Sequence, residues 1–177
     1  MRGFTSLAEQ LPPAEVASRL NRFYSLASNT IFDYDGTLDK LVGDQVMGFF
    51  GAPLYTEDHP ERAVQAALRI INAMSSLAPT EHLHVGAGIA TGEAFVGNVG
   101  EGTVTDYTVL GDTVNVAARL QGAAASGEIL VTEETYAHVE SGFPNASRRE
   151  LELKGKSELV RARVILVGDK LSGAQLS

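Results

Sequence analysis

VTDYTVLGDTVNVAARL (Val104–Leu120) changes its hydrophobic pattern at the pair Gly111-Asp112. Before this pair, apolar and β-branched residues predict a strand, and after it the spacing of apolar residues predicts a helix. We predict Asp112 as the helix N-cap, because a carboxylate there can accept the unpaired N–H groups of the first turn. The stretch therefore predicts a strand, a tight turn and a helix in succession.

Two polar residues of the predicted helix, Asn115 and Arg119, are four positions apart. Side chains at this spacing leave the same face of a helix. An amide and a guanidinium on one face near a helix start suit a ligand that carries phosphates and a sugar. The alternative from these residues alone is a capped surface helix with a solvated arginine.

A second stretch upstream, LDKLVGDQVMGFFGAP (Leu38–Pro53), contains a lysine, a Gly-Asp pair and a Phe-Gly-Ala-Pro sequence. Together with the first stretch it resembles the class III nucleotidyl cyclase domain, the catalytic domain of adenylate and guanylate cyclases. The likeness runs from Arg2 to about Val167 and is closest to the bacterial adenylate cyclase type. The residues that carry it are Lys40, Gly43-Asp44, Phe50-Gly51-Ala52-Pro53 and Asp106–Leu120.

The resemblance implies an α+β fold with a ferredoxin-like βαββαβ core. The family has a buried first strand that ends in a metal-binding aspartate, and neither has a counterpart before Met1. We expect a single cyclase domain at residues 1–168, N-terminally truncated, and a flexible tail at residues 169–177. We also expect a head-to-tail homodimer that converts ATP to 3′,5′-cyclic AMP and pyrophosphate.

The roles implied by the resemblance transfer to individual residues of this chain. Asn115 would orient the ribose and Arg119 would stabilise the transition state, as catalytic residues. Asp44 would hold metal, either Mg²⁺ or Mn²⁺ with two ions per site, and only weakly because the other aspartate is missing. The expected substrate-binding residues are Lys40 and Thr108 for the base, and Lys154, Gly3, Phe4 and Thr5 for the phosphates.

Lys40 and Thr108 also bear on the choice of nucleotide. Guanylate cyclases usually carry glutamate at the lysine position, and the pair of lysine with threonine resembles a bacterial adenylate cyclase subtype. We therefore prefer ATP to GTP. A hydroxyl both accepts and donates hydrogen bonds, so it discriminates less sharply than a carboxylate.

Composition limits the other function classes. The chain has 177 residues, 44% of them hydrophobic, and a formal net charge of −8, which disfavours a nucleic-acid partner. It has no cysteine, and hence no disulfide or thiolate metal site. No apolar run approaches the roughly 20 residues that span a bilayer. We expect a cytoplasmic domain that makes no membrane contact itself.

Two readings compete with the cyclase. FDYDGTL (Phe32–Leu38) matches the nucleophile motif of haloacid-dehalogenase-like phosphatases, with Asp33 as nucleophile and Asp35 as its partner. That chemistry needs a buried strand before Asp33, whereas the preceding residues predict a helix, and Asp35-Gly36 predicts a turn. The other reading is an inactive cyclase-like domain that dimerises or senses nucleotides, favoured by the missing metal-binding aspartate.

The remaining pattern predicts the other elements of the chain. Alternating polarity predicts strands, and glycine-rich segments predict turns or loops. The predicted elements are a hairpin at Gly36–Gly51, strands at Leu83–Ile89 and Glu93–Val99 joined by a turn at Thr91-Gly92, a loop at Gly97–Thr103, a strand at Glu128–Thr132, a helix ending near Val139, an irregular segment at Phe143–Arg149 and a terminal hairpin of Leu151–Lys156 with Val160–Val167.

Overall fold

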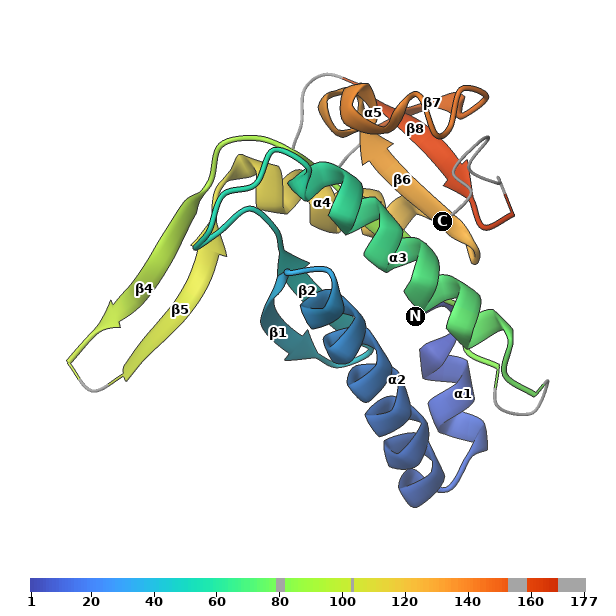
Figure 1. The fold of residues 1–177 in the computed structure, drawn as a ribbon. Helices are drawn as coiled ribbons and strands as arrows, with labels where there is room; N and C mark the ends of the chain where they lie inside the picture. Colours follow the sequence, from blue (N-terminus) through green and yellow to red (C-terminus); the bar gives the residue numbers. More distant parts are fainter. Residues whose placement is uncertain (79–81, 103, 153–158, 169–177) are drawn as a thin grey trace.

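The computed structural model describes residues 1–78, 82–102, 104–152 and 159–168 (Figure 1). The predicted tail at residues 169–177 lies outside the described residues, and the single domain at residues 1–168 stays a prediction. In chain order the elements are α1 (Phe4–Gln10), α2 (Pro13–Asp33), β1 (Thr37–Val42), β2 (Gln45–Phe49), α3 (His59–Ser75), β3 (Ala87–Ile89), β4 (Phe95–Glu101), β5 (Val104–Leu110), α4 (Asp112–Ala123), β6 (Glu128–Thr132), α5 (Glu133–Val139), β7 (Ser147–Leu151) and β8 (Val160–Leu166).

A four-stranded mixed sheet in the order β3-β6-β8-β7 forms the centre of the fold. Strand β6 pairs in parallel with β3 and antiparallel with β8. Its residues Ile129, Leu130 and Val131 are completely buried. Successive side chains of a strand point to opposite faces, and accordingly Ile129 and Val131 belong to one core cluster and Leu130 to another.

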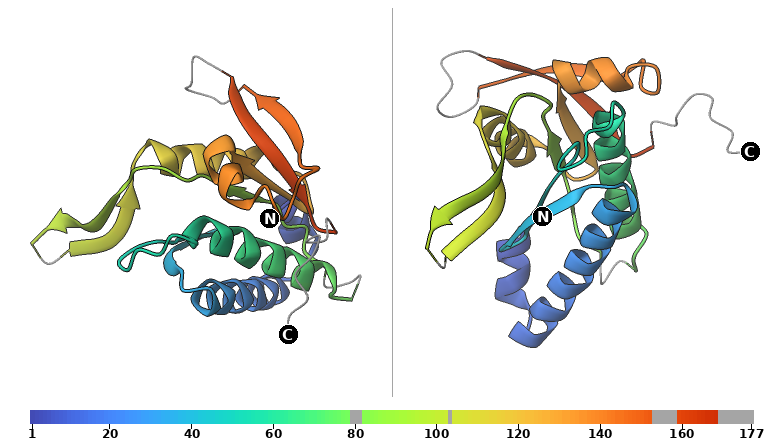
Figure 2. Two further views of the ribbon diagram at one scale, coloured as in Figure 1. Left: turned by 45° about the horizontal axis from the view of Figure 1, so that its top comes forward. Right: turned by 60° about the vertical axis from the view of Figure 1, so that its left-hand side comes forward.

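Helices cover both faces of this sheet. Buried residues of α3 (Val64, Ile71 and Met74) share the larger core cluster with Ile129 and Val131. On the other face, Leu120 and Ala124, at the C-terminal end of α4, pack with Leu130. Figure 2 shows α2 and α3 running side by side, away from α4. The helix that carries Asn115 and Arg119 is therefore fixed to the sheet by its own apolar face.

Strands β1 and β2 form a separate antiparallel hairpin with Gly43-Asp44 at the turn, as the sequence predicts. Gly48 of this hairpin faces α2, since a Cβ added there would lie 3.0 Å from Ile31 Cδ1. The register shifts between Leu38 and Lys40, so Asp39 is an extra residue in β1. Such a bulge reverses the alternation of side chains, and it directs Lys40 to the face opposite α2.

The first two residues of the chain contact the turn of the β1–β2 hairpin and the segment that precedes β3. The α-ammonium of Met1 donates to the Asp44 carbonyl at 2.9 Å, and the Arg2 backbone N–H donates to the His84 carbonyl at 2.6 Å. Met1 is buried in the core cluster that also contains Leu83 and Val85. Residues 1 and 2 therefore lie between the turn of the hairpin and the segment that leads into β3, and no strand of the hairpin pairs with the four-stranded sheet within the described chain.

The predicted pairing of residues 83–89 with 93–99 is wrong. Strand β3 is short and pairs with β6, whereas β4 extends to Glu101 and pairs with β5 along its whole length. The segment predicted as a loop at residues 97–103 is therefore mostly strand. Strands β4 and β5 form a two-stranded arm that projects from the body (Figure 1), at residues 95–101 and 104–110.

The structure corrects the predicted starts of two elements and confirms two other predicted elements. Helix α4 begins at Asp112 with Gly111 as its N-cap, so Asp112 lies in the first turn instead of capping it. Strand β7 begins at Ser147, within the segment predicted to be irregular. Strand β6 and helix α5 match the prediction, and the Thr132 hydroxyl caps α5 by accepting from the Thr135 N–H at 3.3 Å.

A salt bridge between Glu128 and Arg149 at the start of β6 predicts that the stability of the fold depends on pH. Glu128 accepts two bonds from Arg149, at 2.8 and 2.7 Å, and one from the Ala125 N–H at 2.8 Å. The hydrogen bond from Arg149 is the main reason why the pKa of Glu128 lies below its usual value. We expect Glu128→Gln to lower the free energy of unfolding at pH 7 by about 1.5 kcal/mol.

The same pKa shift sets the direction of the pH effect. Because the pKa of Glu128 is lower in the folded state, its stabilisation is present above the unfolded-state pKa and is lost as the pH falls through the folded-state pKa. Denaturant unfolding between pH 7 and pH 3 measures this difference. The exposed Glu9 serves as control through Glu9→Gln. A gap between the unmodified chain and Glu128→Gln that persists undiminished at pH 3 would contradict the assignment.

Among the described helices, none has the length and apolar character required to cross a membrane.

Candidate functional site

The structure brings Lys40 of β1 and Thr108 of β5 together across 68 positions of sequence. The Lys40 ammonium donates to Thr108 Oγ1 at 3.3 Å and also to Asp106 Oδ2. Thr108 is buried, whereas the Lys40 side chain is 39% exposed. The bulge at Asp39 makes this contact possible, because it turns Lys40 away from α2 and towards β5.

Carboxylates keep Lys40 in its charged form. The hydrogen bond with Asp106 is the largest cause and raises the pKa of Lys40; desolvation, the next largest, lowers it, and the charges of Asp39 and Asp106 raise it, so that the pKa lies above its usual value. Lys40 is consequently an ammonium at neutral pH and acts only as a hydrogen-bond donor. Its ammonium contacts Thr108, and the Lys40 side chain is partly exposed to solvent.

Asn115 and Arg119 lie on α4, one turn apart, as the sequence predicts. Asn115 is exposed and Arg119 is half-buried. The Arg119 Nη1 atom is buried without a hydrogen-bond partner among the described residues. Buried guanidinium groups are normally paired, so this nitrogen is an unused cationic donor. Phosphate oxygens are the acceptors that an arginine fork binds best.

Asp44 lies at the turn of the β1–β2 hairpin, where its side chain is 27% exposed. Its Oδ2 atom forms an ion pair with the α-ammonium of Met1 at 2.7 Å. No cluster of three or more histidine, cysteine, aspartate or glutamate side chains occurs in the part of the chain that the structure describes. The described residues thus offer Asp44 but no cluster that would by itself make the two-metal site that the resemblance implies.

The structure describes three of the four predicted phosphate-binding residues. Gly3 adopts φ of 68° and is the N-cap of α1, with Phe4 and Thr5 in the first turn of that helix. This places their backbone N–H groups at a helix start, where anions are favoured. The predicted Lys154 lies outside the described residues. The roles of Gly3, Phe4, Thr5 and Lys154 stay predictions.

The phosphatase reading lacks its structural setting. Asp33 is the last residue of a 21-residue helix, not the end of a buried strand, and its carboxylate pairs with Arg69 Nη1 at 3.0 Å. Asp35 lies in the following turn with φ of 56° and pairs with Arg62. Both carboxylates are engaged with arginines on the α2–α3 side of the molecule, as expected for a helix end and a turn.

Sequence reasoning missed two carboxylates of the Lys40 environment, Asp106 and Asp39. Asp106 is two positions before Thr108 in a strand, so their side chains share one face. That alternation was a usable signal. The bulge that places Asp39 beside Lys40 leaves no signal in the residues themselves, because it arises from the register with β2.

The mixed sheet, the flanking helices and the paired β4–β5 arm together make the fold of a nucleotidyl cyclase catalytic domain. Residues 1–165 match the model for the adenylate and guanylate cyclase catalytic domain, and the chain belongs to that family. Two solved structures share the fold over 93% of this chain. They are the guanylyl cyclase Cya2, with TM-score 0.86, 30% identity and 86% of its chain covered, and the adenylyl cyclase CyaB from P. aeruginosa, with TM-score 0.80, 34% identity and 89% covered.

Among curated proteins, adenylate cyclase 1 of Rhizobium meliloti (strain 1021) is 35% identical over 125 residues, which is 67% of this chain. The match covers 19% of that protein. A protein of Mycobacterium tuberculosis (strain ATCC 25618 / H37Rv), Rv1318c, is 32% identical over 90% of this chain and 30% of its own length. The chain thus spans less than a third of these relatives. Adenylyl and guanylyl cyclases both occur among the similar structures.

Proposed function

We propose that the chain is the catalytic domain of an adenylate cyclase, which converts ATP to 3′,5′-cyclic AMP and pyrophosphate. The observation that carries this proposal is the hydrogen bond between Lys40 and Thr108. These are the two residues that the resemblance assigns to base recognition, and they meet although they are far apart in sequence. A lysine donor at this position favours adenine, whose N1 atom accepts a hydrogen bond.

The proposed reaction is an intramolecular displacement at phosphorus. The ribose 3′-oxygen bonds to the α-phosphorus, its proton leaves to solvent, and the bond to the β-phosphate oxygen breaks, releasing pyrophosphate. Asn115 orients the ribose so that the 3′-oxygen faces the α-phosphorus. Arg119 donates to the α-phosphoryl oxygens, where charge develops in the transition state. Lys154 holds the β- and γ-phosphates.

Mg²⁺ or Mn²⁺ at Asp44 is the other part of the family's chemistry. The described residues around Asp44 form no cluster of three or more metal-ligating side chains and do not by themselves make a site for two such cations. The proposal therefore assigns no step to a metal and rests on the residues that bind and orient the nucleotide.

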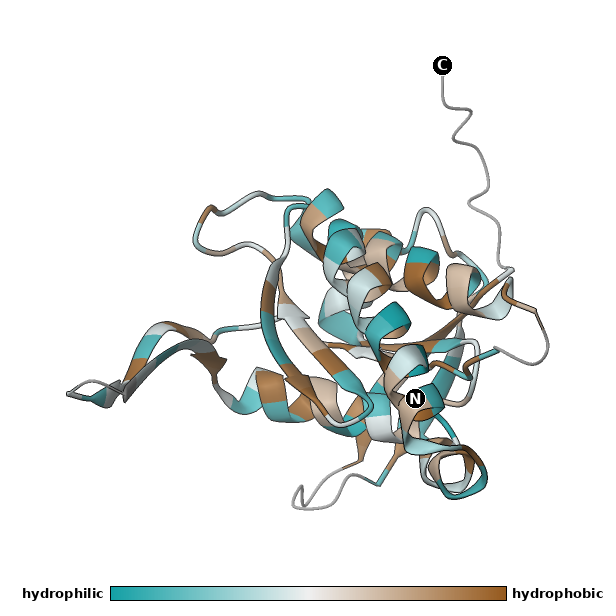
Figure 3. Ribbon diagram, turned by 90° about the horizontal axis from the view of Figure 1, so that it is seen from below, coloured by the Kyte–Doolittle hydropathy of each residue, from teal (hydrophilic) through white to brown (hydrophobic). Residues whose placement is uncertain are grey.

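We propose a homodimer as the functional unit, with Asn115, Arg119 and Lys154 of one copy facing Asp44 of the other. The β4–β5 arm supports this, because large apolar side chains remain exposed along it. Their exposed fractions are 56% for Phe95, 38% for Val99, 43% for Tyr107 and 48% for Leu110. Figure 3 shows brown, hydrophobic segments interspersed with hydrophilic ones along the projecting arm. An apolar arm of this kind is typical of a protein contact surface.

A second candidate is a cyclase-like domain that binds nucleotide without turnover. The observation that favours it is that Asp44 belongs to no cluster of three or more metal-ligating side chains among the described residues. A guanylate cyclase is a third, since the structure of the guanylyl cyclase Cya2 matches with TM-score 0.86. For either the enzyme or the binding module, the cytoplasm is the proposed location.

The test is product formation from ATP and from GTP with Mn²⁺, resolved by chromatography, beside equilibrium binding of both nucleotides. Cyclic AMP as the main product supports the proposal. Cyclic GMP from GTP in its place shows a guanylate cyclase. Tight ATP binding with no cyclic product favours the binding module, and the absence of binding of either nucleotide contradicts all three readings.

A further inference from the structure

The segment that leads into β3 carries two histidines on the side that faces away from the core. Leu83 and Val85 are buried in the larger core cluster, whereas His82 is half-buried and His84 is exposed. Burial therefore alternates along this segment as it does in a strand, and both imidazoles lie on its outer side. Their ring centroids are 4.7 Å apart, and the ring planes are inclined by 48°.

The separation of the two rings is the one that a shared metal ion requires. A Zn²⁺–N bond of about 2.1 Å places the ion about 3.2 Å from the centroid of the imidazole. Two imidazoles bound to one ion at an angle of about 90–110° then have centroids about 4.5–5.2 Å apart. The observed 4.7 Å lies within this range, so His82 and His84 can bind one ion with little movement.

A hydrogen bond to Ser126 orients one of these rings. The His84 Nδ1 atom lies 3.2 Å from Ser126 Oγ. When Nδ1 carries the proton and donates to this hydroxyl, Nε2 holds the lone pair that binds a metal. The backbone around Ser126 is itself fixed to the histidine segment, because the Gly127 N–H donates to the Val85 carbonyl at 2.9 Å. The ring of His84 is thus held by a partner that does not need to move.

The described residues supply two ligands, and water is the source of the others. No third histidine and no carboxylate joins this pair to form a cluster of three in the described part of the chain. A cavity of about 180 Å³, lined by His82 and Ser126 together with apolar side chains such as Ile71, lies next to the pair and has room for water. Imidazole nitrogen suits Zn²⁺, Cu²⁺ and Ni²⁺, whereas Mg²⁺ takes oxygen ligands.

We propose that His82 and His84 bind one divalent transition-metal ion, such as Zn²⁺, with Ser126 as the residue that orients His84. This site differs in ligand chemistry from a Mg²⁺ or Mn²⁺ site at Asp44. The inference does not rest on the proposed function, because neither histidine has a role in binding or converting the nucleotide. A bound ion would hold the entry to β3 in place beside the loop between α4 and β6.

The experiment is equilibrium binding of Zn²⁺ to the full chain, measured by calorimetry, together with NMR of the histidine rings. We expect one Zn²⁺ per chain, with changes in the imidazole signals of His82 and His84 that Mg²⁺ does not cause. His82→Ala and His84→Ala should each weaken Zn²⁺ binding by about 100-fold or more, since each removes a ligand. Ser126→Ala should weaken it by about tenfold, the smaller effect of a group that orients a ligand.

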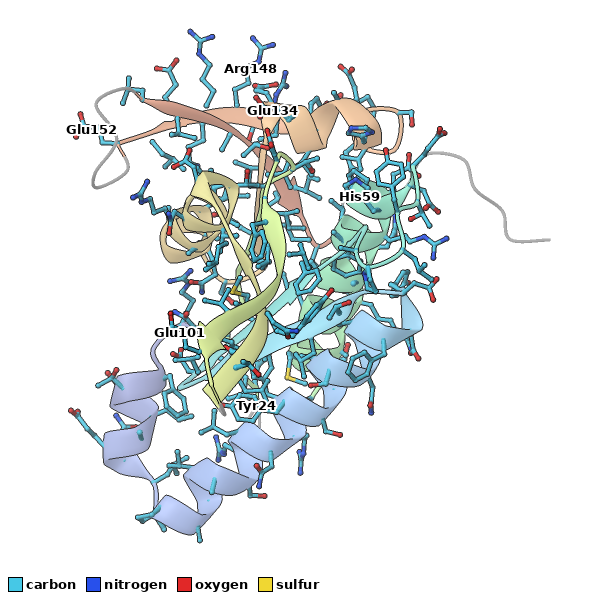
Figure 4. All side chains as sticks on the ribbon, turned by 90° about the vertical axis from the view of Figure 1, so that its left-hand side faces the viewer. Tyr24, His59, Glu101, Glu134, Arg148 and Glu152 are labelled. Atoms are coloured by element: carbon cyan, nitrogen blue, oxygen red, sulfur yellow. The ribbon has the colours of Figure 1, made fainter. Side chains whose placement is uncertain are left out.

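The matched control is His138→Ala, which removes an exposed histidine of α5. His59, at the start of α3, lies on the side of that helix next to α5 (Figure 4). Burial is the largest cause that lowers the pKa of His59, and the charge of His138 lowers it further, so these two histidines are the rival pair. We expect His138→Ala to bind Zn²⁺ as tightly as the unmodified chain.

Three results would overturn the inference. The first is the absence of saturable Zn²⁺ binding by the unmodified chain. The second is unchanged affinity in His82→Ala and His84→Ala. The third is a Zn²⁺-dependent change in the imidazole signals of His59 and His138 in place of those of His82 and His84. The NMR measurement uses the unmodified chain, so it decides the question even if a variant does not fold. None of these results bears on the proposed cyclase reaction.

Discussion

Gly88→Ala is expected to lower the free energy of unfolding by about 3 kcal/mol, a cost typical of severe overpacking. A Cβ atom at position 88 would lie 2.1 Å from the Gln121 backbone nitrogen and 2.4 Å from the Ala117 carbonyl oxygen. Both are main-chain atoms of α4, so no side chain can rotate away. Helix and strand would have to separate along the contact between β3 and α4.

Helix α4 cannot move away from Gly88 without a large cost in free energy. Leu120 is completely buried and Ala124 is 2% exposed, both against Leu130 of the central strand. Moving α4 away from Gly88 would open this second core cluster, and the cost of a cavity would be added to the cost of the clash. Because α4 also carries Asn115 and Arg119, the same shift would displace the proposed catalytic residues.

Gly122→Ala is the matched control. Gly122 lies in the same helix, and a Cβ atom added there would meet no other atom within 4 Å. Alanine is favoured over glycine in a helix, so this variant should gain about 0.5–1 kcal/mol. Denaturant unfolding measures both variants. A Gly88→Ala chain as stable as the unmodified one would show that β3 and α4 do not pack this closely.

Local patterns predicted the elements that depend on neighbouring residues. The β1–β2 hairpin follows from apolar runs on either side of Gly43-Asp44, and α5 follows from the cap residue Thr132. The pairing of strands that are distant in sequence could not be predicted from local patterns. Strand β3 was expected to be joined by a turn to the next strand, but it pairs in parallel with β6, whose Ile129 and Val131 are buried in the larger core cluster, and local sequence does not encode that choice.

The candidate site shows the same division. Asn115 and Arg119 could be placed together because helical spacing alone brings them to one face. The contact of Lys40 with Thr108 came from the resemblance, since nothing local relates positions 68 apart. Strand alternation could have placed Asp106 beside Thr108, whereas the position of Asp39 beside Lys40 depends on the register of β1 against β2.

Arg119→Met is expected to lower cyclase turnover strongly while stabilising the nucleotide-free chain. The Arg119 Nη1 atom is buried and lacks a hydrogen-bond partner among the described residues, and a buried donor nitrogen without a partner costs free energy in the folded state. Methionine has a similar length and no polar atom. Its introduction should raise the free energy of unfolding by about 1 kcal/mol.

The loss of activity has a separate cause. If Arg119 donates to the α-phosphoryl group as charge develops there, its removal should lower kcat about 10²- to 10³-fold, the usual cost of one transition-state donor. ATP affinity should change far less than kcat, because the contact strengthens in the transition state. Rates of cyclic AMP formation and ATP binding on the same preparations separate these effects.

Arg69→Met supplies the control for the same change of residue type. Arg69 is 54% exposed on α3 and pairs with Asp33 at 3.0 Å. A surface ion pair of this kind contributes little, so we expect unchanged turnover and a change in stability below about 1 kcal/mol. The decisive feature of Arg119→Met is that stability is predicted to rise while turnover is predicted to fall.

A variant that loses both stability and activity would mean that Arg119 supports the fold. Undiminished turnover would show that Arg119 takes no part in the reaction. A gain in stability together with a loss of turnover is expected only if the folded chain holds the Arg119 guanidinium, with its unpartnered Nη1 atom, ready to bind the nucleotide.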